Sequence, residues 1–446
     1  MPATKPIDTL INAHWIIPVE PDETVHEDYA VAVHDGRIVA LLPQADARQR
    51  FQATETVDLP EHTLIPGLVN AHTHSPMSLF RGLADDLPLM TWLNKHIWPA
   101  EDRWVDAGFV RDGARLAMAE MIRGGTTCFN DMYFFPDQVA EVARECGLRA
   151  VIGLIVIDMP TAWASDADEY FRKGERVHDN YRSIPLIHTC FAPHAPYTVS
   201  DDPLRHIAML AEELDIPVHM HIHETTHEVE TALEQHGRRP LQRLRELGLL
   251  GPRLLAVHMT QLNDDEIQEL GRCGVSVVHC PESNLKLASG FCPVQALLQA
   301  GVNVALGTDG AASNNDLDML GEMRSGALLA KAVSADTTAV PAHQALRMAT
   351  LNGARALAID SETGSLEVGK SADIAAIDLG ALETCPVYDP ASQIVYAAGR
   401  EQVTDVWVAG RRLLRQRELT SLDTAAIRAT AGQWHQRIQE SDHNPR

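Results

Sequence analysis

Two histidines close the apolar segment of residues 66–74, and their spacing could serve metal chemistry. Side chains alternate along a strand with a period of two, so His72 and His74 are expected to point to the same side. Catalytic zinc commonly takes three protein ligands plus water, so this pair could supply half of a divalent metal site. A single His-x-His pair is weak evidence, because most such pairs lie on surfaces or in loops. The rest of the chain has to support the metal interpretation.

A histidine or carboxylate recurs near the end of one predicted strand after another between residues 64 and 360. Apolar runs typical of buried parallel strands alternate with helical patterns such as residues 107–123 and 137–146. The eight predicted strands cover residues 64–74, 126–131, 149–157, 185–193, 217–224, 253–261, 274–282 and 302–310. Eight strand–helix alternations are what a closed parallel barrel requires, so the sequence predicts an α/β fold with a (β/α)8 TIM barrel.

The carboxyl ends of the strands hold the reacting groups in such barrels. Polar residues at these ends therefore become candidates for one site: His72, His74, His221 and Asp309. The chain has 21 histidines, so some coincidences are inevitable, and an isolated buried histidine is more often a hydrogen-bonded core residue. We keep that ordinary interpretation for His188, His206 and His219.

The two ends of the chain have an all-β texture. Short strands are predicted at residues 7–19, 31–42 and 56–64, and again at 372–378 and 403–414. Each terminal set is too thin for a core of its own, so both are expected to share one small composite β-sandwich. A helix is predicted at residues 424–439, before a polar tail at 440–446. The predicted domains are residues 1–63 (sandwich, first part), 64–360 (barrel) and 361–446 (sandwich, second part, plus the helix).

Composition narrows the class of protein. A chain of 446 residues with 45% hydrophobic content can bury a sizeable core, and a net charge of −24 without a dense Lys/Arg run argues against nucleic-acid binding. Seven cysteines without framework spacing suit a reducing compartment. The polar start and the lack of a long apolar window predict no signal peptide and no membrane helix, so we expect a cytoplasmic enzyme.

With these residues in place, the chain resembles the amidohydrolase superfamily and, within it, the 5'-methylthioadenosine/S-adenosylhomocysteine deaminases. The resemblance runs end to end. It rests on PGLVNAHTH at residues 66–74, SLFRGL at 78–83, WPAED at 98–102, PHAPY at 193–197, HIHE at 221–224, HCPESNLKL at 279–287 and GTDGAASNN at 307–315. A barrel flanked by a composite β domain is also that family's architecture.

The resemblance implies one divalent metal ion per subunit, usually zinc, held by His72, His74, His221 and Asp309. Neutral imidazoles and one carboxylate leave such an ion Lewis-acidic, so that its water can ionise near neutral pH. The native metal stays open, because iron, manganese and zinc all accept these ligands. The resemblance further implies an adenosine-type nucleoside as substrate and a homo-oligomeric assembly.

Catalytic and substrate roles follow from the same resemblance. Asp309 would take the proton of the water, Glu224 would protonate the purine ring as water adds at C6, and His258 would stabilise the forming hydroxyl. A carboxyl that exchanges a proton near pH 7 needs its pKa raised by burial. His194 and Glu101 look like substrate contacts, with Glu101 accepting hydrogen bonds from the ribose hydroxyls.

Several of these residues have an ordinary alternative. From the sequence alone, Glu101 is better explained as an acidic residue that complements the dipole at a helix start. His279 is interpreted as a residue that supports the site without binding the metal. Cys280 has no local base and is expected to be a packed thiol.

Of three rival functions, the first stays open, while the sequence argues against the other two. The substrate could be another ring, such as guanine, cytosine or a triazine. A binuclear hydrolase usually needs a carbamylated lysine at the end of the fourth strand, and no lysine lies between Lys173 and Lys286. A scaffold that has lost its chemistry would be free to lose ligands, whereas every expected ligand and Glu224 are present here.

The group on the 5' carbon of the substrate is harder to predict. In the family, arginines after the third barrel strand are thought to hold the carboxylate of S-adenosylhomocysteine. The corresponding stretch, residues 158–182, begins with apolar and acidic residues and carries Arg172 and Arg176 only later. This favours methylthioadenosine.

Overall fold

The strands predicted for the middle of the chain form one parallel eight-stranded sheet in a computed structural model that describes residues 4–442. Each strand lies beside its sequence neighbours, in the order β12-β11-β10-β9-β8-β7-β6-β5. The strands are β5 Leu68–Thr73, β6 Thr126–Asp131, β7 Arg149–Val156, β8 Ile187–Pro193, β9 Val218–Ile222, β10 Leu254–His258, β11 Ser276–His279 and β12 Asn303–Leu306. The predicted TIM-type barrel is confirmed.

The segment after β12 closes the barrel against β5. The Asn70 amide donates to Thr308 Oγ1 at 2.8 Å, and the Thr308 N–H donates back to Asn70 Oδ1 at 3.0 Å. One residue further, the Asp309 N–H donates to the carbonyl of His72 at 3.0 Å. The chain segment that carries Asp309 is therefore held directly beside the strand that carries His72 and His74.

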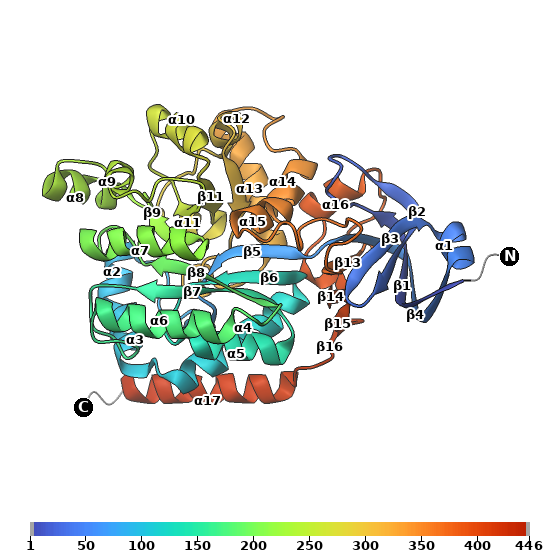
Figure 1. The fold of residues 1–446 in the computed structure, drawn as a ribbon, viewed down its shortest axis with the longest axis horizontal. Coiled ribbons are helices and arrows are strands. Elements are labelled where there is room, and N and C mark those ends of the chain that lie inside the picture. Colours follow the sequence, from blue (N-terminus) through green and yellow to red (C-terminus); the bar gives the residue numbers. More distant parts are fainter. Residues whose placement is uncertain (1–3, 443–446) are drawn as a thin grey trace.

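Helices surround this sheet (Figure 1). The segments between β5 and β8 are η1 Ser75–Phe80, α2 Leu89–Trp92, η2 Leu93–Ile97, α3 Trp98–Trp104, α4 Ala107–Arg123, α5 Pro136–Cys146 and α6 Ala167–Tyr181. Those after β8 are α7 Asp201–Leu214, α8 Thr226–His236, α9 Pro240–Glu246, α10 Asp264–Cys273, α11 Pro281–Lys286, α12 Val294–Gln299, α13 Met319–Ser334, α14 Ala342–Met348 and α15 Leu351–Ala356. Local signals fix many ends: the Asp106 side chain caps α4, and Gly147 ends α5 in the left-handed conformation.

Both ends of the chain build a second, mixed sheet, which we call the terminal sheet (Figure 1). Its strands are β1 Lys5–Ile16, β2 His26–His34, β3 Arg37–Pro43, β4 Phe51–Pro66, β13 Ile374–Asp378, β14 Val403–Val408, β15 Arg411–Arg415 and β16 Glu418–Leu419. The two ends join where β4 pairs antiparallel with β13. Short helices α1 Gln44–Arg50, η3 Arg400–Gln402 and α16 Pro390–Tyr396 accompany these strands. The predicted composite β domain is confirmed.

The strand expected at residues 64–74 is in fact divided between the two sheets. Leu64, Ile65 and Pro66 end β4 and pair with β13, and β5 starts at Leu68. Gly67 makes the transition, and a Cβ atom there would lie 2.1 Å from the Thr127 side chain. The domain boundaries themselves stay a prediction.

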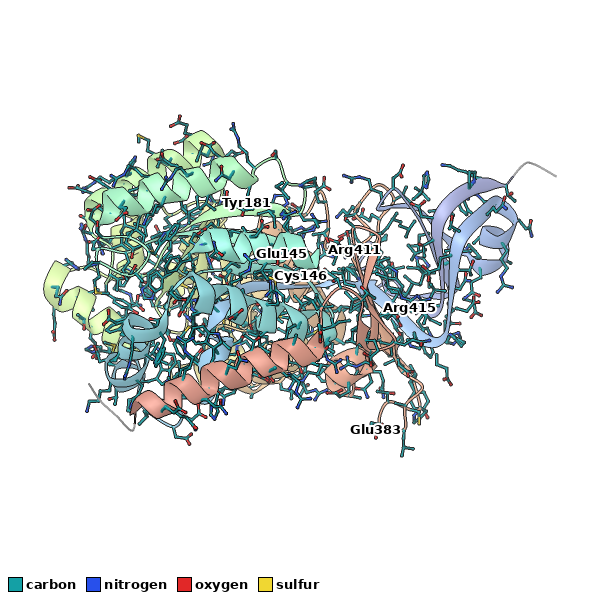
Figure 2. All side chains as sticks on the ribbon, turned by 90° about the horizontal axis from the view of Figure 1, so that it is seen from below. Glu145, Cys146, Tyr181, Glu383, Arg411 and Arg415 are labelled. Carbon is teal, nitrogen blue, oxygen red and sulfur yellow. The ribbon has the colours of Figure 1, made fainter. Side chains whose placement is uncertain are left out.

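Several contacts fasten the terminal segments to the barrel, including the two that follow. The buried Arg149 guanidinium on β7 pairs with Asp373, just before β13, at 2.8 Å. The predicted closing helix is α17 Thr424–Asp442, which runs along the barrel below α4, and Trp434 donates from Nε1 to Asp112 at 2.9 Å (Figure 1). Figure 2 shows Cys146, at the end of α5, beside Arg411 of β15 at the border of the two parts.

The remaining expectations concern the chain ends and the membrane. Residues 1–3 of the polar start and residues 443–446 of the expected tail lie outside the described residues, and α17 already includes residues 440–442. Among the helices of residues 4–442, none has the length and apolar character that a membrane crossing requires.

Candidate active site

The four predicted metal ligands meet at the carboxyl-terminal end of the barrel. His72 is near the end of β5, His74 directly follows it, His221 is near the end of β9, and Asp309 follows β12. Their candidate ligand atoms all lie within 4.8 Å of one another. The sequence separates these residues by up to 237 positions, so the barrel topology is what brings them together.

Short distances define the centre of this cluster. Asp309 Oδ1 lies 3.3 Å from His72 Nε2 and 3.2 Å from His74 Nε2. His221 Nε2 lies 3.2 Å from His72 Nε2. Three imidazole nitrogens and one carboxylate oxygen therefore converge on one point, a donor set that suits zinc.

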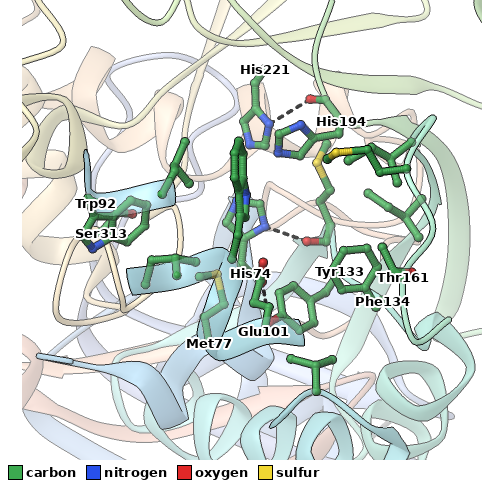
Figure 3. Close-up of a pocket in the computed structure, with 18 of the residues that line it drawn as sticks. His74, Met77, Trp92, Glu101, Tyr133, Phe134, Thr161, His194, His221 and Ser313 are labelled. Carbon is green, nitrogen blue, oxygen red and sulfur yellow. Dashed lines mark hydrogen bonds between the residues drawn. The ribbon is translucent and has the colours of Figure 1, made fainter. Parts of the chain in front are cut away.

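A hydrogen bond on the outer side of the imidazole determines which ring nitrogen faces the centre of the cluster. His74 Nδ1 lies 2.6 Å from the carbonyl of Met132, and His221 Nδ1 lies 2.8 Å from the carbonyl of His194 (Figure 3). A carbonyl only accepts, so Nδ1 carries the hydrogen and a neutral ring presents the Nε2 lone pair to the centre. The residues present thus fit a divalent ion.

Electrostatics also favour a bound positive charge at this point. Burial opposes ionisation of Asp309, yet the hydrogen-bonding imidazoles of His72 and His74 hold the pKa of its carboxyl well below the usual range. Burial lowers the pKa of His72 to about 4, whereas contact with Asp309 outweighs burial and raises the pKa of His74 to about 9. The cluster thus favours positive charge at its centre, which a divalent cation would supply.

Two hydroxyls hold the second oxygen of Asp309. Ser283 Oγ donates to Asp309 Oδ2 at 2.6 Å, and Ser313 Oγ donates to the same atom at 2.9 Å. Asp309 itself has a φ of +61°, an uncommon conformation outside glycine that the surrounding hydrogen bonds must maintain. This arrangement leaves Oδ1 directed at the metal position.

Glu224 lies beyond the end of β9 and is almost fully buried. Burial raises the pKa of its carboxyl, as a group that must hold a proton near neutral pH requires. Its Oε2 is 3.9 Å from Nε2 of His258, the last residue of β10. His258 Nδ1 in turn lies 2.9 Å from Asn284 Oδ1, so the HCPESN segment orients His258.

A cavity of about 290 Å³ opens above the cluster. Seven of the predicted site residues line it: His74, Glu101, His194, His221, Glu224, His258 and Asp309. His72 is buried beneath them. The structure therefore brings all eight predicted site residues to one place, while their individual roles stay predictions.

Glu101 also lines the cavity. Its Oε1 accepts a hydrogen bond from the Tyr133 hydroxyl at 2.7 Å, and burial raises the pKa of its carboxyl to about 7 (Figure 3). α3 continues directly from η2, so Glu101 is not at a free helix start. The dipole-capping explanation that the sequence alone favoured is therefore not supported.

The residues set aside as ordinary histidines divide into two groups. The His206 ring contacts the Phe171 ring at a tilt, His188 is half-buried, and neither histidine lines the cavity. His219 is a hydrogen-bonded core residue, but its Nε2 lies 2.8 Å from Nδ1 of His72. It therefore supports a predicted metal ligand, a role that the His219–His221 alternation could have indicated.

The two remaining motif residues do not reach the cavity. His279 is buried, and burial lowers its pKa to about 3. Cys280 is also buried, and burial raises the pKa of its thiol well above the ordinary value, which fits a packed thiol. Tyr133, Ser283 and Ser313 were not predicted as site residues, because no local pattern marks these contacts.

Much of the cavity lining is apolar. Its apolar residues include Trp92, Leu93, Ile97, Phe134, Ile157 and Met159. Arg172 and Arg176 are exposed on α6 and lie outside the lining, and no lysine or arginine is among the described residues that form it. Among residues 4–442, the charged groups on the lining besides histidine are carboxylates.

Comparison with known proteins places this geometry in a family. Residues 63–413 match the amidohydrolase family. A protein of Saccharophagus degradans named 5-methylthioadenosine/S-adenosylhomocysteine deaminase is 51% identical over 434 residues, which cover 97% of each chain. A namesake from Teredinibacter turnerae is 49% identical and covers 98% of this chain and 99% of its own.

Comparison with solved structures leads to the same family. A structure described as an adenosine deaminase from Xanthomonas campestris with bound zinc is 58% identical, with a TM-score of 0.97 over 98% of this chain and 100% of that chain. Atrazine chlorohydrolase from Arthrobacter aurescens, in complex with zinc, is 23% identical, with a TM-score of 0.89 over 96% of this chain and 99% of its own, and shares the fold. The chain therefore belongs to the amidohydrolase family and, within it, to the family of the 5-methylthioadenosine/S-adenosylhomocysteine deaminases.

Proposed function

We propose that this protein is a metal-dependent hydrolytic deaminase that converts the 6-amino group of 5'-methylthioadenosine to the inosine analogue and ammonia. S-adenosylhomocysteine and adenosine would be further, weaker substrates. The observation that carries the proposal is that the four-residue cluster, Glu224 and Glu101 meet at one cavity. The names of the relatives support the same reaction.

The ligand residues would hold one zinc ion, and the similar structure from Xanthomonas campestris is described with bound zinc. When bound, such an ion lowers the pKa of a coordinated water and so supplies a nucleophile near neutral pH. Asp309 would accept the proton of that water, and Glu224 would deliver a proton to the purine ring as the C6–O bond forms. The proton held by Asp309 would then pass to the 6-amino group, so that the C6–N bond breaks and ammonia leaves. The new hydroxyl would return its proton to Glu224 and become the carbonyl of the inosine analogue. His258 hydrogen-bonds to the developing hydroxyl.

Glu101 and His194 would position the nucleoside. An ionised Glu101 accepts hydrogen bonds from the two ribose hydroxyls, which orients the base towards the cluster. His194 shares the cavity wall, and its Nδ1 contacts Thr198 Oγ1 at 2.9 Å, which fixes the ring. Together these contacts bring C6 to the metal side and direct the 5' substituent to the apolar wall.

The apolar wall favours the methylthio group over homocysteine. A methylthio group buries apolar surface there, whereas the carboxylate of S-adenosylhomocysteine finds carboxylates and no cation on the lining. Like charges at close range oppose binding. We therefore expect kcat/KM for methylthioadenosine to exceed that for S-adenosylhomocysteine by about 10-fold or more, a difference of about 1.4 kcal/mol.

Ammonia release from a panel of 5'-methylthioadenosine, S-adenosylhomocysteine, adenosine, guanine and cytosine tests the proposal, with bound metal quantified on the same sample. The fastest release is expected from methylthioadenosine, and chelator-treated protein should be inactive until zinc is returned. A higher kcat/KM for S-adenosylhomocysteine would refute the pocket argument. Release only from guanine or cytosine, or none with stoichiometric metal, would refute the substrate class.

Removal of the Tyr133 hydroxyl should weaken nucleoside binding with little effect on chemistry. In Tyr133→Phe, Glu101 loses a hydrogen bond that favours its ionised form, so its pKa rises further above the ordinary range. The ionised form binds ribose, so kcat/KM is lost as pH falls through this pKa. We expect KM for methylthioadenosine to rise about 2- to 10-fold and the acid limb of kcat/KM to move to higher pH.

A pH profile of kcat/KM for both proteins measures this shift. Tyr181→Phe is the matched control, because its hydroxyl bonds the Asp137 carbonyl, away from the cavity. An unchanged acid limb together with an unchanged KM would remove Glu101 from ribose binding. A cytoplasmic location and homo-oligomeric assembly stay predictions from composition and resemblance.

A further inference from the structure

The backbone that carries Glu224 departs from strand geometry just before that residue. β9 ends at Ile222, and His223 has a φ of +54°, in the left-handed region. A β-carbon makes this conformation costly, so it persists only where neighbouring groups hold it. The direction of the Glu224 side chain depends on this turn.

One carboxylate holds the turn from the side of α8. Glu228 Oε1 accepts a hydrogen bond from the His223 N–H at 3.0 Å, and Oε2 accepts one from the Glu224 N–H at 2.8 Å. Glu228 is 7% exposed and is not on the cavity lining. It therefore contacts the backbone of Glu224 without access to a bound nucleoside.

The comparison with α10 shows how this differs from a simple helix cap. In α10 the side chain of Glu266 returns to the N–H of the N-cap residue Asn263 at 3.0 Å, which completes a capping box. In α8 the N-cap Thr225 accepts from the Glu228 N–H at 3.3 Å, so the first half of the motif is present. The Glu228 side chain, however, passes Thr225 and binds the two preceding N–H groups.

The segment after β10 holds the same turn through the carbonyls of His223 and Glu224. The Thr260 N–H donates to the His223 carbonyl at 3.0 Å, and Thr260 Oγ1 donates to the Glu224 carbonyl at 2.7 Å. The N–H groups are thus fixed by α8 and the carbonyls by the segment after β10. Both polar groups of each residue are occupied.

We propose that Glu228 is a positioning residue that sets the direction of the Glu224 carboxyl for proton transfer. The inference rests on the proposed function of Glu224. The geometric part of the inference concerns only the backbone of His223 and Glu224, and it can be tested without measuring catalytic activity.

The test is Glu228→Gln in the metal-replete protein. The amide has the same shape but only one acceptor oxygen, so one of the two N–H bonds is lost. Small misplacement of a reacting group costs up to about 100-fold in rate, so we expect kcat for methylthioadenosine to fall about 10- to 100-fold. KM should stay within about 3-fold and metal content should not change, because Glu228 touches neither ligand nor cavity.

Two comparisons separate positioning from simple stabilisation. In a Glu224→Gln background, Glu228→Gln should cause no further loss of kcat, because residues that act as one unit are non-additive. Asn263→Ala, which removes the N-cap of α10, should leave kcat unchanged. A kcat of Glu228→Gln within 3-fold of wild type, or a further loss in the Glu224→Gln background, would overturn the proposal.

Hydrogen exchange supplies the readout that does not need activity. The amides of His223 and Glu224 should exchange faster in Glu228→Gln than in wild type, and Asn263→Ala should not change them. Unchanged exchange overturns the proposal even if the protein is inactive on every nucleoside tested. Faster exchange in a protein inactive on the panel would support the geometric part and refute only the proposed substrate.

Discussion

Asp309→Asn is expected to lose both metal and turnover. The change removes a carboxylate that lies 3.2 to 3.3 Å from two imidazoles and that we propose as metal ligand and as proton acceptor for the water. Loss of a positioned proton acceptor alone costs about 10²- to 10⁴-fold, and loss of a ligand adds to it, so kcat should fall by roughly 10⁴-fold or more. Metal content per chain and kcat for methylthioadenosine should be measured on one sample.

Asp166→Asn is the matched control for this variant. Asp166 caps α6 outside the cavity, and asparagine caps helices about as well as aspartate. It should retain metal and rate. Wild-type turnover by Asp309→Asn would show that the chemistry takes place elsewhere.

Glu224→Gln should lose turnover while it keeps metal. The amide fills the same volume beside His258 but can neither give nor accept the proton that the ring needs, so kcat should fall about 10²- to 10⁴-fold. Metal content should match wild type, because Glu224 is not among the cluster residues. This combination distinguishes Glu224→Gln from Asp309→Asn.

Steady-state kinetics with metal analysis checks the expectation, and an equilibrium binding measurement with methylthioadenosine adds a second readout. The variant should still bind the nucleoside, since Glu101, the proposed ribose contact on the cavity lining, is unchanged. Near-normal kcat with full metal would assign the acid–base role to another residue. Loss of metal in this variant would mean that Glu224 maintains the ligand geometry.

The sequence predicted the barrel and the position of its cluster because both follow from short-range patterns. A parallel strand buried on both faces is an apolar run, and a period of two puts His72 and His74 on one side. Asp309 became a candidate because the carboxyl ends of barrel strands share one location. These rules do not require knowledge of which distant side chains contact one another in the folded protein.

Side-chain contacts between residues that are far apart in the sequence were not predicted. The pairing of His219 with His72 and of Tyr133 with Glu101 joins residues far apart in sequence, and nothing local marks either partner. Glu228 does sit in a recognisable Thr-x-x-Glu cap pattern, but the pattern does not reveal that the side chain passes the cap to reach Glu224. The division of residues 64–74 was missed because Pro66 and Leu68 both read as strand.

The joint at Gly67 leaves no hinge between the two sheets at that point. A single residue separates β4 from β5, its N–H is bonded to the Asp373 carbonyl at 3.0 Å, and the Arg149–Asp373 pair locks the same corner. Domain closure around a substrate requires residues whose φ and ψ can change freely. The barrel and terminal sheet should therefore move as one rigid body, so shielding of the bound nucleoside and release of product fall to the loops over the cavity, such as residues 157–162.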